Sequence, residues 1–307
     1  MTIYPSGNQY QIDFQDQSAT IVEVGGGIRE YRVGQREVLE SYPVEAMCDG
    51  AHGTPLMPWP NRLEDGKYSF DGNQYQVDIT EPAKNNAIHG FLRWQAWNLI
   101  EQTDNHLTMA IRIHPRSGYP FTLEISVTYS LSDEGLTVAI KAENLGKTAC
   151  PFGAGQHPYL SPGNGLIDDC VVTLDADTRI LTDNPRQLPR GSEPVFGSEF
   201  DFREGKKLNQ QSLDYPFTDL ARDRDGKAWI KLLGPDGHSA EIWVDESYKL
   251  IEMYTGDTLS PSRRRHGLGA EPMTCPPNAF KSGEDLVRLN PGDTFTGKWG
   301  AKLAKPF

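Results

Sequence analysis

Short runs in which apolar and polar residues alternate recur from one end of the chain to the other. The clearest lie at residues 106–114, 122–130 and 136–142, and the turn sequence Ser132-Asp133-Glu134-Gly135 separates the last two. Successive side chains of a β-strand point to opposite faces, so this period of two predicts strands with one buried face. Similar runs are expected as strands at residues 10–14, 19–24, 28–33, 67–70, 74–79, 97–101, 171–174, 229–233, 240–244, 250–254 and 295–303.

Helical signals are nearly missing from this pattern. Almost no segment carries a sustained helical stripe, and 30 glycines and 22 prolines are many for a helical protein. Asp71-Gly72 between two strand-like runs is a strong hairpin signal. We expect an all-β fold, a large antiparallel β-sandwich formed as a single domain by residues 1–307, with long functional loops. Residues 182–209 have no strong period and are expected to form a partly ordered loop over the sandwich.

Charge and cysteine spacing exclude several classes of function. A net charge of -12 repels nucleic acids and anionic membranes, so neither is an expected partner. The chain shows no signal-peptide pattern at residues 1–8 and no run of 18 apolar residues, so we expect no export and no membrane span. Cys48, Cys150, Cys170 and Cys275 lack the spacing of a metal or redox motif. Reduced thiols, a cytoplasmic location and no metal are therefore expected.

The segment from residue 150 to residue 162 places one histidine among residues that restrict or free the backbone. Pro158 biases His157 toward an extended conformation. Gly153 and Gly155 lack a Cβ atom, and we expect them to leave room for a ligand beside the imidazole. The alternative is a half-buried histidine in a proline-rich turn, and this segment by itself favours that alternative.

Two further segments present polar side chains from stiff backbone. Pro58 and Pro60 flank Trp59 and present Asn61 and Arg62, whose guanidinium suits sugar hydroxyls or a carboxylate. A structural salt bridge is the alternative for Arg62.

The second of these segments centres on a histidine near two tryptophans. His89 in Ile88-His89-Gly90 is followed by Trp94 and Trp97, and an aromatic face can stack on a hexose. Trp97 alternates with Leu99, which favours a place in the core for Trp97.

Two carboxylates complete the set of candidate residues. Asp214 in Leu213-Asp214-Tyr215-Pro216 can accept hydrogen bonds from hydroxyls, although this segment by itself favours an Asx-turn. Glu271 precedes Pro272 and has apolar neighbours that would raise its pKa by desolvation. A carboxylate and a histidine tuned in this way could transfer protons at both ends of one substrate.

Together these segments resemble the aldose 1-epimerases, the galactose mutarotase-like proteins, over nearly the whole chain. The resemblance is carried by Pro58-Trp59-Pro60-Asn61-Arg62 with Asp65-Gly66, Ile88-His89-Gly90, His157-Pro158-Tyr159, Asp214 with Phe217, and Glu271-Pro272 with Pro276-Pro277. It implies a β-sandwich that interconverts the α and β anomers of a free sugar without metal or nucleotide. It also implies that Glu271 is the general base, His157 the general acid and His89 a second active-site histidine. Arg62 and Asp214 match the family's substrate-binding pair, and we add Asn61 and Trp94 as candidate sugar contacts.

Two departures from the family pattern concern the preferred sugar. The family's Asp-His reads Asp214-Tyr215 here, and the chain is shorter than the best-known galactose mutarotases. An anionic hexose, such as sulfoquinovose or a hexose 6-phosphate, is therefore an alternative substrate, and Arg263-Arg264-Arg265-His266 could meet its charge. The alternative for this basic run is a solvated turn after Pro261, which we favour because runs of charge usually face water.

Two other classes of protein bear on the activity. After a mutarotase of a neutral hexose and one of an anionic hexose, the third interpretation is a non-catalytic sugar-binding sandwich, because the fold alone does not fix the activity. A nucleotide-dependent epimerase is disfavoured, because no G-x-G-x-x-G opens a helix. The expected partner is a small sugar, and the expected state is a monomer or homodimer.

Overall fold

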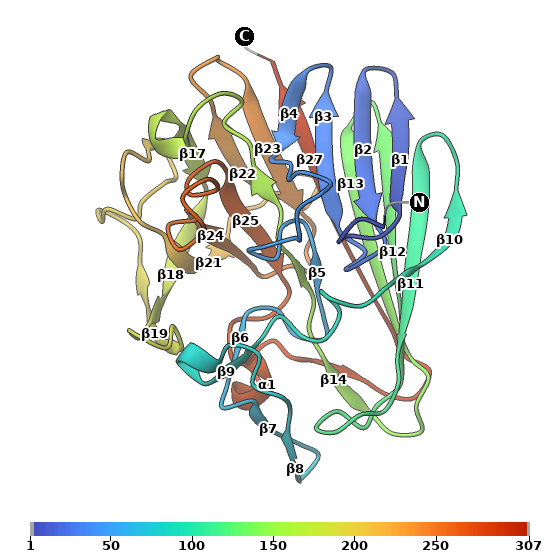
Figure 1. Ribbon diagram of the computed structural model, residues 1–307. Helices are drawn as coiled ribbons and strands as arrows, with labels where there is room; N and C mark the ends of the chain where they lie inside the picture. Colours follow the sequence, from blue (N-terminus) through green and yellow to red (C-terminus); the bar gives the residue numbers. More distant parts are fainter. Residues whose placement is uncertain (1–2, 306–307) are drawn as a thin grey trace.

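The computed structural model describes residues 3–305, which form two large antiparallel β-sheets (Figure 1). The first sheet is 12-stranded and runs in the order β1-β2-β3-β4-β16-β25-β24-β21-β18-β19, with β15 joined to β25 and β5. Its strands are β1 (Gln9–Phe14), β2 (Gln17–Val22), β3 (Ile28–Val33), β4 (Arg36–Leu39), β5 (Pro55–Leu56), β15 (Gly155–Gln156), β16 (Tyr159–Leu160), β18 (Ala176–Thr182), β19 (Pro189–Pro194), β21 (Asp214–Leu220), β24 (Leu250–Tyr254) and β25 (Leu268–Met273).

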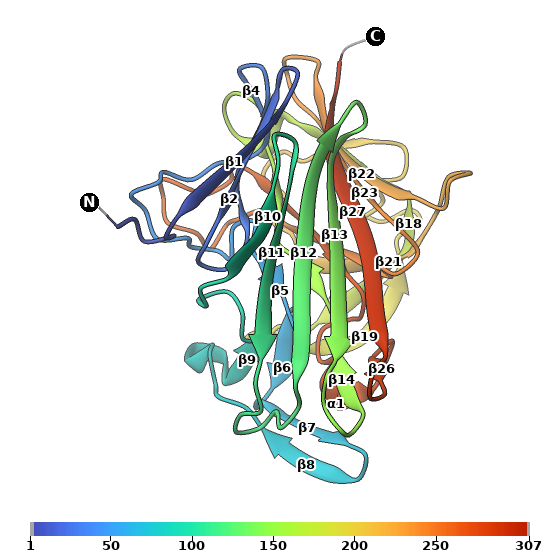
Figure 2. The ribbon, with the colours of Figure 1, turned by 90° about the vertical axis from the view of Figure 1, so that its right-hand side faces the viewer.

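The second sheet is 9-stranded, and Figure 2 shows its strands β10 to β13 and β27 side by side. Its order is β10-β11-β12-β13-β27-β23-β22-β17-β20. The strands are β10 (Asn98–Gln102), β11 (His106–Ile113), β12 (Leu123–Ser132), β13 (Gly135–Asn144), β17 (Val171–Leu174), β20 (Lys206–Lys207), β22 (Ala228–Leu233), β23 (Ser239–Val244) and β27 (Thr294–Ala304).

Smaller elements gather at one end of the sandwich (Figure 1). They are the strand pairs β6 (Arg62–Glu64) with β9 (Asn86–Ile88), β7 (Lys67–Phe70) with β8 (Asn73–Gln76), and β14 (Cys150–Phe152) with β26 (Val287–Leu289), and the short helix α1 (Ala279–Ser282). Two 3-10 turns lie at Pro82–Lys84 and Ile167–Asp169. Within residues 3–305, no helix is long and apolar enough to cross a membrane.

The alternation in the sequence sets the core of the sandwich. Along β12, the side chains of Leu123, Ile125, Val127, Tyr129 and Leu131 are all buried, and the residues between them are half-buried. Burying one such apolar side chain stabilises the fold by about 1.5–3 kcal/mol. The expected all-β architecture and the hairpin at Asp71-Gly72 are confirmed, since β7 and β8 pair around that turn.

The expectation of a partly ordered loop at residues 182–209 missed two strands. This stretch contains β19, which pairs with β18 at the edge of the first sheet, and β20, which pairs with β17. Most residues of β19 are exposed, so the strand has no buried face and leaves no period in the sequence.

The position of β25 in the first sheet brings distant segments together. This fully buried strand pairs with β24 on one side and with β15 and β16 on the other. His157 lies between β15 and β16, where its amide donates to Thr54 O at 3.1 Å and its carbonyl accepts from Gly53 N at 2.8 Å. The backbones of His157 and Glu271 are therefore held by the same sheet.

Candidate active site

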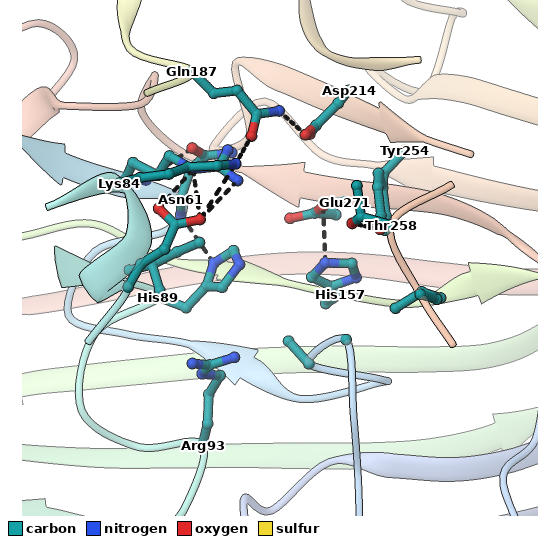
Figure 3. Close-up of a pocket in the computed structure, with 16 residues that line it drawn as sticks. Asn61, Lys84, His89, Arg93, His157, Gln187, Asp214, Tyr254, Thr258 and Glu271 are labelled. Carbon is teal, nitrogen blue, oxygen red and sulfur yellow. Dashed lines mark hydrogen bonds and ion pairs between the residues drawn. The ribbon is translucent and has the colours of Figure 1, made fainter. Parts of the chain in front are cut away.

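A cavity of about 200 Å³ opens beside β25 and holds six of the seven predicted site residues (Figure 3). Its walls include the side chains of Asn61, Arg62, His89, His157, Asp214 and Glu271. Trp94 is the exception, because its side chain is 48% exposed and lines a neighbouring cavity instead. The prediction of a sugar contact at Trp94 is therefore not supported by its position. Trp97 is buried in the core, as expected.

At the centre of the cavity, His157 and Glu271 form a direct pair. Nε2 of His157 lies 3.1 Å from Oε1 of Glu271, and the two residues are only 5% and 3% exposed. The other polar atoms of the pair, His157 Nδ1 and Glu271 Oε2, are buried without a hydrogen-bond partner among residues 3–305. Buried polar atoms are nearly always satisfied, so unpartnered ones are typical of a functional site.

Burial moves the pKa values of this pair in opposite directions. It lowers the pKa of His157 to about 3, and the positive charge of Arg93 adds to that effect. Burial raises the pKa of Glu271 well above its usual value, and the negative charge of Asp214 adds to it while Arg62 opposes it. Both shifts favour the uncharged form of each group, so one proton is retained by the pair, and the short contact lets the two groups exchange it.

Aromatic stacking fixes the plane of the His157 ring. The ring stacks on Tyr159 with centroids 4.9 Å apart, and Tyr159 stacks on His52 at 4.1 Å. The Tyr159 hydroxyl donates to Gly50 O at 2.8 Å, which anchors the middle ring. The imidazole is therefore positioned before any ligand binds.

His89 is oriented by Asn61. The backbone amide of Asn61 donates to His89 Nδ1 at 3.1 Å, so Nε2 of the neutral ring carries the proton. Burial lowers the pKa of His89 well below its usual value, which keeps the ring neutral. The rings of His89 and His157 lie 5.6 Å apart by their centroids, so His89 presents a donor next to the proton-transfer pair.

Arg62 forms the structural salt bridge considered for it, and its role in binding a substrate stays a prediction. Its Nε lies 3.1 Å from Glu81 Oε2, and it also lines the cavity beside Asn61. Asp214 is not in an Asx-turn; it is the first residue of β21 and faces the cavity, where the side chain of Gln187 bridges it to Lys84 (Figure 3).

Arg93 lines the cavity and was not predicted. The guanidinium has no ion pair and no hydrogen bond in the part of the chain that the structure describes, although burial lowers its pKa. In Figure 3 it lies on the opposite side of the two histidines from Asp214 and Gln187. No local pattern marks this residue except its closeness in sequence to His89.

Glu252 is a second buried carboxyl group that the motifs did not indicate. It stands on β24 directly opposite Glu271 on β25, is 1% exposed, and accepts from Asn61 Nδ2 at 3.2 Å. Burial raises its pKa well above the usual value, and the charges of Asp214 and Glu271 add to that effect, which favours the uncharged carboxyl group. In the sequence, the one signal for Glu252 was a carboxylate inside the apolar run at residues 250–254.

The proposed role of the glycines before His157 is wrong. A Cβ on Gly155 would lie 2.9 Å from Pro272 O and from Pro60 Cβ, and a Cβ on Gly153 would lie 2.5 Å from Cys275 Sγ. Neither glycine lines the cavity. Their missing side chains therefore allow close packing of the backbone rather than space for a sugar.

Two of the three arginines at residues 263–265 form ion pairs within the fold, and all three lie outside the cavity wall. Arg265 is buried and pairs with Asp168 and Asp257. Arg263 is half-buried and lies 3.4 Å from Glu40. The expectation of a solvated turn is correct for the exposed Arg264 and wrong for the other two arginines.

The cavity has one grouping with the spacing of a metal site. One ligand atom from each of His89, His157 and Glu271 lies within 4.8 Å of the others. The positive charges of Arg62 and Arg93 act on both histidines and would repel a cation there. The repulsion supports the expectation that the protein works without a metal, which stays a prediction.

Known proteins are similar to this chain in both sequence and fold. The family model described as Aldose 1-epimerase matches residues 8–301. The protein YihR of Escherichia coli K12, described as uncharacterized, is 34% identical over 94% of this chain and 90% of its own length. Galactose mutarotase of Homo sapiens is 30% identical over 64% of this chain and 56% of its own length.

Solved structures give the same result at lower identity. The GalM/aldose epimerase homologue from C. elegans has a TM-score of 0.85 at 18% identity, covering 98% of this chain and 99% of that chain. Galactose 1-epimerase from Lactobacillus acidophilus has a TM-score of 0.80 at 18% identity, covering 98% and 99%. The fold is therefore a β-sandwich of the galactose mutarotase type.

Proposed function

Because the chain belongs to the aldose 1-epimerase family, we propose that it is a mutarotase that interconverts the α and β anomers of a free hexose. One observation carries the proposal: a histidine and a glutamate with oppositely shifted pKa values lie 3.1 Å apart in a cavity. Opening a hemiacetal requires one base and one acid on neighbouring atoms, and this pair supplies both.

The reaction uses the single proton that the pair retains. With this proton on His157, Glu271 takes the proton of the anomeric hydroxyl O1 while His157 protonates the ring oxygen O5. The C1–O5 bond breaks and C1 becomes an aldehyde. Rotation about C1–C2 presents the other face of the carbonyl, and reversal of both proton transfers closes the ring to the other anomer.

The remaining polar residues hold the sugar and orient the pair. His89 Nε2–H donates to the oxygen at which charge develops. Arg62 and Asp214 bind ring hydroxyls as donor and acceptor respectively. Asn61 acts through its hydrogen bonds to His89 and Glu252, which makes it a positioning residue for this chemistry.

Anomer exchange tests this function directly. Freshly dissolved α-glucose or α-galactose is followed by polarimetry or proton NMR with and without the protein. We expect acceleration above the buffer rate. Binding of sugars without acceleration of any hexose would identify a carbohydrate-binding sandwich instead and would exclude the mutarotase.

An anionic hexose is the second candidate substrate, and Arg93, which has no ion pair within residues 3–305, favours it. A half-buried guanidinium without a counter-ion is a ready partner for a sulfonate or phosphate. With O5 at His157, the ring carbon that carries C6 is bonded to O5 and would therefore lie on the histidine side of the sugar. Arg93 lies on that side, so the charge of sulfoquinovose or a hexose 6-phosphate could reach it.

Charge removal at Arg93 separates the two substrates. We expect Arg93→Gln to lower kcat/KM for glucose 6-phosphate or sulfoquinovose by about 10- to 100-fold, the equivalent of a charged hydrogen bond, with a smaller effect on glucose. Arg264→Gln removes an exposed arginine outside the cavity and serves as the control. Equal losses on neutral and anionic sugars would exclude the anion-binding role.

We also propose that residues 1–307 work as one catalytic unit in the cytoplasm. Walls of one cavity come from residues as far apart as Gly50 and Glu271, which supports a single domain. All four cysteines are buried free thiols, which is typical of a reducing compartment.

A further inference from the structure

A second cavity, called the side cavity below, adjoins the catalytic cavity at Arg93. Its volume is about 180 Å³, and its walls include Trp59, Thr80, Phe91, Trp94 and Arg116. Ile88 and Arg93 line both the side cavity and the catalytic cavity. The two cavities therefore meet at the side of the histidines that faces away from Asp214 (Figure 3).

The charges in the walls of the side cavity favour an anion. The guanidinium of Arg93 has no ion pair and no hydrogen bond within residues 3–305, and burial lowers its pKa. Arg116 lies 3.5 Å from the largely exposed carboxylate of Asp78, which also lines the cavity. Two guanidinium groups thus accompany one carboxylate, so the walls carry a net positive charge that an anionic ligand would complement.

Trp59 supplies a second donor without a partner. The residue is only 3% exposed, and its buried indole N–H makes no hydrogen bond in the described part of the chain. Buried donors of this kind are rare in native structures, because leaving one without an acceptor costs free energy. Since Trp59 lines the side cavity, a ligand there, or a water that the ligand holds, can supply the missing acceptor.

Aromatic rings form much of the remaining wall. Trp59 and Phe91 pack edge to face with centroids 4.8 Å apart, and the Arg116 guanidinium lies 4.3 Å from the centroid of the Phe91 ring. Trp94 is 48% exposed, with the Arg93 guanidinium 5.6 Å from the centroid of its ring. Aromatic faces beside guanidinium groups suit a flat apolar body that ends in an anion. A cavity of about 150 Å³ can hold benzene, so the side cavity has room for one ring.

We propose that the side cavity is a binding site for a small aromatic carboxylate, with its ring against the aromatic walls and its carboxylate paired with Arg93. An inorganic anion alone would leave the aromatic walls unfilled, and a neutral sugar would leave the charge of Arg93 unpaired. The site is separate from the sugar site and does not depend on the proposed catalytic function. Because the charge of Arg93 also acts on His89 and His157, an occupied side cavity would change the field at both histidines.

Benzoate is the probe for this site, and isothermal titration calorimetry measures its binding to the protein. We expect saturable binding with a Kd of about 1 mM or tighter. Benzamide has nearly the same shape without the charge and should bind at least about tenfold more weakly. Arg93→Gln should weaken benzoate binding by about 10- to 100-fold, because it removes the charged hydrogen bonds to the carboxylate.

Residues that line only one of the two cavities decide where benzoate binds. Gln95→Glu adds a negative charge to the side cavity and Trp94→Leu removes its exposed ring, and neither residue lines the catalytic cavity. Each change should weaken benzoate binding by about threefold or more. Asp214→Asn changes a charge in the catalytic cavity only, and Gln210→Glu adds an exposed charge outside both cavities. Both controls should leave the Kd unchanged within about twofold.

Three results would overturn the proposal. The first is no saturable binding of benzoate up to about 10 mM. The second is equal binding of benzoate and benzamide, which would show that the charge of Arg93 selects no anion. The third is tighter binding to Asp214→Asn with no effect of Gln95→Glu or Trp94→Leu, which would place benzoate in the catalytic cavity. None of these results bears on the mutarotase function, which anomer exchange tests separately.

Discussion

The sharpest prediction concerns Glu271→Gln, compared with the same change at Glu252. Glutamine keeps the shape of Glu271 and can still hydrogen-bond His157 Nε2, so the free energy of unfolding should change by no more than about 1 kcal/mol. It cannot accept a proton, however, and a positioned general base contributes about 10²- to 10⁴-fold. We expect kcat/KM to fall by that factor, which corresponds to about 2.7–5.5 kcal/mol in the barrier.

Glu252→Gln is the matched control, because Glu252 is equally buried and lies directly across from Glu271 in the sheet. Its raised pKa favours the uncharged carboxyl, and a neutral acid resembles an amide, so activity should change little. The assay is anomer equilibration by NMR, with urea unfolding to compare stability. Equal losses in the two variants would show that buried negative charge near Asp214, rather than a base at Glu271, controls the rate.

Three further predictions address other parts of the site. Because the pKa of His157 is about 3, kcat/KM should stay level as the pH falls from neutral through 6.5, where an ordinary histidine titrates. On the alkaline side, kcat/KM should fall as the pair of His157 and Glu271 loses its proton. A fall in kcat/KM centred near pH 6.5 would refute the assignment. Gly155→Val should destabilise the fold by about 1–3 kcal/mol through contact with Pro272 O and Pro60, seen in urea unfolding, and a stable but inactive variant would contradict this. Dialysis against EDTA should leave the rate of anomer exchange unchanged, whereas a loss restored by Zn²⁺ would show that His89, His157 and Glu271 hold a metal.

The sequence alone determined the class of fold and most of the chemical groups of the site. Alternation with a period of two is a local property, so the order of residues by itself locates runs such as β12 and β13. Proline-flanked segments also marked Arg62, His157 and Glu271, since a stiff backbone beside a titratable or polar group is visible in the sequence itself.

Only the tertiary structure decided which side chains share the cavity. Strand pairing joins residue 155 to residue 273 and residue 252 to residue 271, and no local pattern fixes such long-range partners. Glu252 therefore emerged from the sheet, the Gln187 bridge between Lys84 and Asp214 from the loop between β18 and β19, and Arg93 from its position beside the two histidines. The same pairing packs Gly155 against Pro272 O, which is why its missing side chain serves the fold rather than the sugar.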